Sequence, residues 1–142
     1  MTKIAKLKSL FELFLGSLRA HPGNVALVVE SKSYTYCELA YLAQEVAIAL
    51  NETNAGSRVG VFANRTVAAY AGVIGILMSG RTYVPMNPKF PGARNESIAT
   101  SAGLSEIVCD SRDLEQVALL DHGKITPIEV TDTQIENLAD LD

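Results

Sequence analysis

Few residues of this 142-residue sequence have the types and spacing that catalysis or metal binding requires. Cys37 and Cys109 are far apart and form no CxxC pair, and neither His21 nor His122 has a cysteine or histidine at metal-ligand spacing. The chain contains neither a GxGxxG nor a GxxxxGK(S/T) phosphate loop. We therefore expect no metal site and no nucleotide site formed by this chain alone.

Two further residues have both a chemical and a structural interpretation. Glu38 is a candidate acid, but Thr35 to Glu38 has the pattern of a capping box, in which the two side chains satisfy each other's backbone amides. Thr66 follows a strand and precedes a helix, a place where α/β folds bind anions. We interpret Thr66 as the N-cap of that helix rather than as a phosphate ligand. The sequence thus predicts no catalytic, cofactor-binding or metal-binding residue.

The stretch from Ala68 to Pro91 organises the expected fold. It is apolar from Tyr70 to Leu77, which predicts a helix covered on more than one side. Gly80 stands where a residue in the left-handed conformation would end this helix. A short strand with Pro85 at a sheet edge is expected next, because proline cannot donate to the strand ladder.

Strands and helices are expected to alternate along the remaining chain. The spacing of apolar residues from Leu7 to Leu18 predicts an amphipathic helix that ends at His21. Further helices are expected at 35–50, 92–102 and 114–120, and strands at 25–29, 33–35, 58–63, 104–109 and 125–130. This order predicts an α/β fold, a layered sheet with helices on both faces.

Composition limits the possible classes of protein. The sequence is 48% hydrophobic and 20% charged, which favours one folded domain over residues 1–130, with residues 131–142 as an acidic tail or linker. A net charge of −4 gives no reason to expect nucleic acid or an anionic membrane as partner. Glu12 interrupts the first apolar run and no small-residue cleavage site follows, so we expect a cytoplasmic protein without a signal peptide.

Two segments carry a resemblance to a known superfamily. Tyr34 to Leu39 (YTYCEL) resembles the first core motif of the adenylate-forming enzymes, approximately (L/Y)-(T/S)-Y-x-E-L. Leu77 to Met86 (LMSGRTYVPM) is similar to their second core motif, L-K-A-G-x-A-Y-V-P-(L/I)-D. The segment from Pro88 to Arg94 is similar to the continuation found in amino-acid-activating members. The resemblance covers most of residues 9–130.

Three positions depart from the second motif. Met78 stands where the family has lysine, Ser79 where it has alanine, and Asn87 where it has aspartate. Both motifs are scaffolding in the family, so these departures leave the class of substrate open.

The resemblance implies the leading part of an ATP-dependent, carboxylate-activating ligase, most like an adenylation domain of a nonribosomal peptide synthetase. The implied reaction forms an acyl-adenylate, with transfer of the acyl group to a carrier-protein thiol. ATP and Mg²⁺ would be cofactors of the complete enzyme. The family's phosphate-gripping loop and catalytic lysine have no match here, so we expect the chain alone to be inactive and to need the missing C-terminal portion or a complementary chain.

Alternatives stay open at this stage. The chain could be part of an acyl-CoA synthetase, or a noncatalytic interaction module that keeps the scaffold without the chemistry. A flavodoxin-like binder of small ligands is a weaker alternative, since the phosphate loop is missing. An exposed apolar patch or a homodimer is expected if another part of the enzyme normally covers this one.

Overall fold

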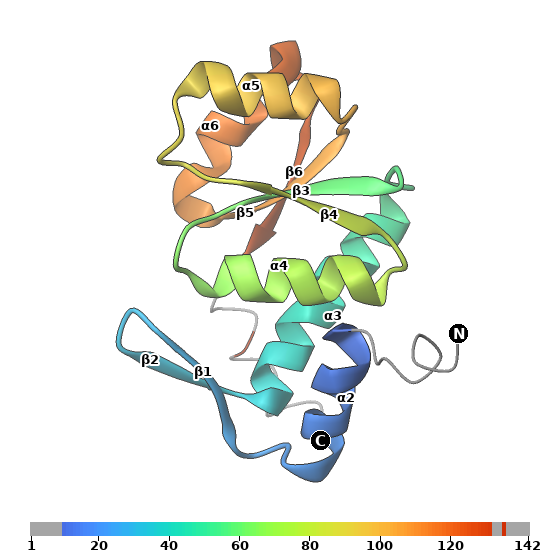
Figure 1. The fold of residues 1–142 in the computed structure, drawn as a ribbon, viewed down its shortest axis with the longest axis vertical. Coiled ribbons are helices and arrows are strands. Elements are labelled where there is room, and N and C mark those ends of the chain that lie inside the picture. The colour runs from blue at the N-terminus through green and yellow to red at the C-terminus, as the bar shows by residue number, and fades with distance from the viewer. Residues whose placement is uncertain (1–9, 132–134, 136–142) are drawn as a thin grey trace, which may run out of the picture.

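The computed structural model describes residues 10–131 and residue 135, and helices alternate with strands as predicted (Figure 1). The first half contains α2 (Leu10–Ala20), β1 (Val25–Val29), β2 (Lys32–Thr35), α3 (Tyr36–Glu52) and β3 (Arg58–Phe62). It is followed by α4 (Val67–Met78), β4 (Thr82–Met86), α5 (Gly92–Ser101), β5 (Glu106–Asp110), α6 (Leu114–Ala118) and β6 (Thr126–Val130). Leu7 and nearly all of the expected acidic tail lie outside the described residues.

The main sheet has four parallel strands in the order β4-β3-β5-β6. Helices α3 and α4 lie on one side of it and α5 and α6 on the other, which confirms the α/β layered fold (Figure 1). The strands β1 and β2 form a separate antiparallel hairpin, also as predicted. Pro85 lies in β4, a strand at the edge of the sheet. Proline has no backbone N–H to donate, and the open side of an edge strand has no neighbouring strand that needs one.

Helix α4 is buried on two sides, which explains why its sequence is apolar almost all round. One side packs on the sheet, where an added Cβ at Gly72 would lie 3.1 Å from Cγ1 of Val108. The other side packs on α3, where a Cβ at Gly75 would lie 2.5 Å from the carbonyl oxygen of Ala43. The helix ends as predicted, with Gly80 at a φ of +79°.

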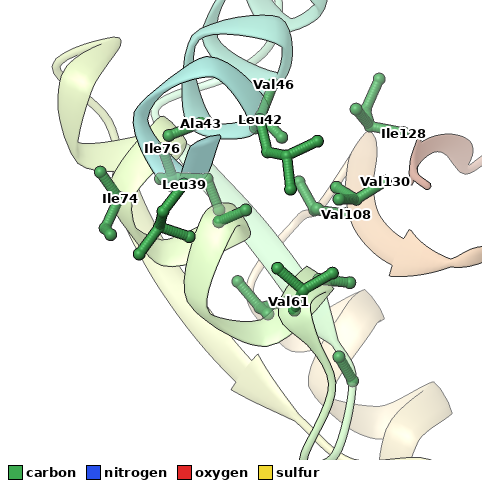
Figure 2. Packing of buried hydrophobic residues seen from close by; sticks show 14 of the residues in the cluster. Leu39, Leu42, Ala43, Val46, Val61, Ile74, Ile76, Val108, Ile128 and Val130 are labelled. Carbon is green, nitrogen blue, oxygen red and sulfur yellow. The ribbon is translucent and has the colours of Figure 1, made fainter. Parts of the chain in front are cut away.

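Two hydrophobic clusters fill the layers on either side of the sheet. The larger one joins α3, α4 and the hairpin to the sheet, with Leu42, Val46, Val61, Ile76 and Val108 among its buried members (Figure 2). The smaller one lies under α5 and α6 and includes Phe62, Met86, Ile107 and Val117. Successive side chains point to opposite faces of a strand, so Val61 of β3 belongs to the larger cluster and the next residue, Phe62, to the smaller one.

The last expected helix is interrupted. Residues 114–120 were predicted as one helix, but α6 ends at Ala118 and a 3₁₀ segment (Leu120–Gly123) follows. Asp121 and His122 both have a positive φ, so the chain reverses there before β6 begins. The carboxylate of Glu96 in α5 accepts a hydrogen bond from the amide of Asp121 at 2.9 Å, which ties this reversal to α5.

Helix α2 is covered less well than the others. None of its residues is fully buried, although Phe14 packs near Tyr36 with ring centroids 6.0 Å apart. An open apolar groove of about 590 Å³ lies between α2 and α4, lined in part by Leu10, Leu13 and Tyr70. The exposed apolar patch expected from the sequence is therefore present. In the described part of the chain, no helix is both long and apolar enough to cross a membrane.

Candidate functional site

The first core motif forms the predicted capping box at the start of α3. The amide of Glu38 donates to Oγ1 of Thr35 at 3.1 Å, and the amide of Thr35 donates to Oε1 of Glu38 at 2.9 Å. Tyr34 and Leu39, the residues that flank the box, are both buried in the larger cluster. Since the Glu38 carboxylate accepts a hydrogen bond from the backbone amide of Thr35, the structure favours the capping role over that of an acid.

Thr66 occupies the N-cap position of α4, as predicted, but it does not cap the helix with its side chain. No first-turn amide of α4 donates to its hydroxyl. The residue is 7% exposed, and its Oγ1 has no hydrogen-bond partner in the described part of the chain. Thr66 is therefore the N-cap residue of α4, as interpreted, but without the side-chain hydrogen bond that usually accompanies this position.

Of the two cysteines, one is buried and the other is exposed. Cys109 is completely buried in β5, and burial together with nearby carboxylates raises the pKa of its thiol to about 12. Such a thiol stays protonated at neutral pH and is a poor nucleophile. Cys37, His21 and His122 are exposed on separate segments. Among residues 10–131 and 135, no group of three or more histidine, cysteine or acidic residues lies close enough to hold a metal ion.

The second core motif contributes an arginine that joins three segments. Nε of Arg81 donates to the carbonyl oxygens of Ala55 and Gly56 at 3.3 and 3.2 Å. Its Nη1 donates to Oδ1 of Asn51 at 2.9 Å. Ser79, at the end of the same motif's helix, donates from its hydroxyl to the carbonyl of Ile76 at 2.7 Å. The motif therefore fastens α4 and β4 to the loop between α3 and β3.

The turn after β4 is held by its own side chains. Oδ1 of Asn87 accepts from the amide of Lys89 at 2.9 Å, and the carbonyl of Asn87 accepts from Nδ2 of the buried Asn95 at 2.8 Å. The Arg94 guanidinium lies 3.9 Å above the centre of the Phe90 ring, a cation–π contact. The departure at Asn87 thus keeps a side-chain oxygen where the turn needs one.

These contacts give residues of both motifs structural roles. Neither brings a nucleophile and a base within hydrogen-bond reach of each other. Sequence reasoning missed the roles of Arg81, Asn95 and Glu96, because each binds a backbone group brought close only by the tertiary fold. The one available signal was the position of Arg81 inside the second motif, Leu77 to Met86, where it is the only charged residue.

Comparison with known proteins agrees with this scaffold. The profile of the AMP-binding enzyme family matches residues 14–141. The chain is 33% identical over 113 residues to syringomycin synthase SyrB1 of Pseudomonas syringae pv. syringae, covering 78% of this chain and 18% of that protein. It is 34% identical over 109 residues to bacitracin synthase 1 of Bacillus licheniformis, covering 75% of this chain and 2% of that protein. The chain spans less than a fifth of either relative.

Solved structures show the same architecture. A nonribosomal peptide synthetase, FmoA3, in a form with bound α-methyl-L-serine-AMP, superposes with a TM-score of 0.78 at 32% identity, covering 89% of this chain and 14% of that one. The N-terminal subdomain of NpsA from Klebsiella oxytoca superposes with a TM-score of 0.72 over 93% of this chain and 33% of that one. At 22% identity the NpsA likeness concerns the fold alone.

This chain thus shares its fold with larger enzymes. The segments that form the capping box, the Arg81 contacts and the turn after β4 lie within the region that matches the family profile. The chain therefore belongs to the AMP-binding, adenylate-forming enzyme family and resembles the first part of an adenylation domain of a nonribosomal peptide synthetase.

Proposed function

We propose that this chain is the structural leading part of an enzyme that activates an amino acid with ATP. In the reaction of the complete enzyme, a carboxylate oxygen of the amino acid attacks the α-phosphorus of ATP, the bond to the leaving oxygen breaks, and pyrophosphate departs. A thiol of a carrier protein then attacks the acyl carbon, and AMP leaves. Mg²⁺ would offset the charge of the departing pyrophosphate.

The match over residues 14–141 to this family is the observation that carries the proposal. Related solved structures are consistent with it, since FmoA3 has been seen with α-methyl-L-serine-AMP and with the ATP analogue AMPPNP. We assign residues 1–130 to the N-terminal subdomain and residues 131–142 to the connection that follows it.

We further propose that the chain is inactive alone. Its sequence contains no glycine-rich phosphate loop, and the side chains of Thr35, Glu38 and Arg81 in the two motifs are engaged in hydrogen bonds within the chain. Its partners would be the remaining portion of an adenylating enzyme, joined to it or supplied as a separate chain, and through that enzyme a carrier protein. The open groove between α2 and α4 is a surface that a second copy of the chain could also cover.

ATP–pyrophosphate exchange tests this proposal. The chain is assayed alone and together with a polypeptide that carries the remaining part of a related adenylation domain, over a panel of amino acids. Exchange is expected only in the mixture and only with some amino acids. Exchange by the chain alone would refute its inactivity.

A noncatalytic interaction module is the competing function. It predicts a stable complex with a partner that neither requires nucleotide nor restores exchange. A complex of that kind, with no exchange for any amino acid tested, would overturn the enzymatic assignment.

A further inference from the structure

A polar cavity of about 290 Å³ lies at the carboxyl ends of the parallel strands, and Tyr34 of the first core motif is among the residues that line it. Its wall is formed by the start of α4 at Thr66 and Val67, by the end of β5 and the residues that follow it from Asp110 to Arg112, and by the end of β6. Glu30 at the tip of the β1–β2 hairpin closes it on another side.

The topology of the sheet makes this place a ligand crevice. After β3, the chain forms β4 on one side of β3. It then passes through α5 and forms β5 on the other side of β3. Open parallel sheets bind ligands outside the carboxyl ends of the strands at the point where the strand order reverses. Here that point lies between β3 and β5; Asp110 is the last residue of β5, and Thr66 ends the loop that leads from β3 to α4.

The start of α4 lacks the groups that normally satisfy a helix N-terminus. This 12-residue helix has no side-chain cap and no acidic residue in its first turn. Thr66 is 7% exposed, lines the cavity, and has no partner for its hydroxyl in the described part of the chain. Rotation of Thr66 about χ1 to another staggered position exchanges hydroxyl and methyl, so the hydroxyl can turn to a new acceptor. An oxyanion is the acceptor that an N-terminus of this kind prefers.

The charges around the cavity limit the size and charge of that oxyanion. Nε of Arg112 donates to Oδ1 of Asp110 at 3.1 Å, and Nη2 of Arg112 pairs with Oε2 of Glu30 at 3.2 Å. One guanidinium thus faces two carboxylates. A polyphosphate would be repelled by them, whereas a single carboxylate or phosphate group can take Arg112 from the exposed Glu30.

We propose that this cavity binds one oxyanion of a small ligand, a carboxylate or a phosphate group, at the N-terminus of α4. The oxyanion accepts hydrogen bonds from the Thr66 hydroxyl and from the amides of Val67 and Ala68. It competes with Glu30 for Arg112. The site goes beyond the function proposed above and needs no other part of an adenylating enzyme.

Amide NMR of the 142-residue chain tests the proposal, with inorganic phosphate and acetate titrated separately at constant ionic strength. The amide signals of Val67 and Ala68 are expected to shift and to saturate with at least one of the two anions. Saturation with phosphate alone, or with acetate alone, identifies which oxyanion the site accepts. Thr66→Val is expected to weaken binding at least about tenfold, because it removes the donor.

Two further variants keep the test independent of folding. Thr66→Val should leave the melting temperature of the anion-free chain unlowered, since the hydroxyl has no partner to lose, and Thr100→Val on the exposed face of α5 should bind like wild type. Glu30→Gln should bind more tightly than wild type, because Arg112 loses a competing carboxylate. The proposal is wrong if neither anion shifts the two amides, if Thr66→Val binds as wild type does, or if Glu30→Gln does not raise the affinity.

Discussion

Gly75 sets the distance between α3 and α4, and adding one methyl group there tests how tightly the larger cluster is packed. The Cβ of an alanine at this position would lie 2.5 Å from the carbonyl oxygen of Ala43 and 2.6 Å from Cβ of Val46. Both atoms belong to the rigid part of α3, so neither can rotate away. The two helices would have to separate by roughly an ångström to restore ordinary contact.

The expected cost follows from two opposing effects. Overpacking a well-packed core costs about 1–3 kcal/mol, and the upper end applies because rigid atoms block the methyl group. Alanine stabilises a helix interior over glycine by about 1 kcal/mol, which offsets part of that cost. Gly75→Ala should therefore lower the free energy of unfolding by about 2 kcal/mol. For a chain of this length, that loss corresponds to a fall in melting temperature of roughly 8 °C.

Gly16→Ala is the matched control, since Gly16 lies inside α2 with nothing within 4 Å of the added Cβ. It should raise stability by up to about 1 kcal/mol through helix propensity alone. Both variants are compared with wild type by thermal and urea unfolding, followed by circular dichroism. If Gly75→Ala is as stable as wild type or is stabilised like Gly16→Ala, the close approach of α3 and α4 is not what the structure indicates.

Three further predictions concern single side chains. Thr35→Ala removes the acceptor for the Glu38 amide and should cost about 1 kcal/mol in urea unfolding. Arg81→Leu removes hydrogen bonds to three neighbouring segments and should cost about 1 kcal/mol, whereas Arg65→Leu at an exposed site should cost little. Burial raises the pKa of Cys109 from 9.0 to about 12, so the protonated thiol is favoured in the folded chain. The free energy of unfolding should therefore fall as the pH rises from 9 toward 12. Cys109→Ala should lose this contribution to the pH dependence of stability. In native conditions a thiol reagent should label Cys37 and leave Cys109 unmodified.

Features set by neighbouring residues could be predicted from the sequence. The capping box at Thr35 and Glu38 depends on a spacing of three residues, and the turn at Gly80 depends on the freedom of glycine at positive φ. The near-absence of polar residues in α4 likewise predicted cover on two sides. The position of the chain in its superfamily followed from two motifs in the correct order, which the family match confirms.

Features set by the approach of distant segments could not be predicted in the same way. Asn95 and Glu96 bind the backbone at residues 87 and 121, and no local pattern marks either contact. The hydroxyl of Thr66 is buried without a hydrogen-bond partner among the described residues, whereas its position in the sequence is that of an ordinary cap. The reversal at Asp121 and His122 was missed because neither residue is a glycine, although both adopt a positive φ.

The two motifs also indicate how substitutions in this part of an adenylation domain should act. The first motif joins the hairpin to α3, and the second joins α4 and β4 to the loop before β3. The second motif thereby fixes the amino ends of β3 and β4, at the edge of the sheet opposite the carboxyl ends where ligands bind in sheets of this kind. Substitutions in either motif should therefore reduce stability first, and any loss of adenylation in the complete enzyme should follow in proportion to the unfolded fraction. A loss of activity without a loss of stability would instead assign a direct catalytic role to the motif concerned.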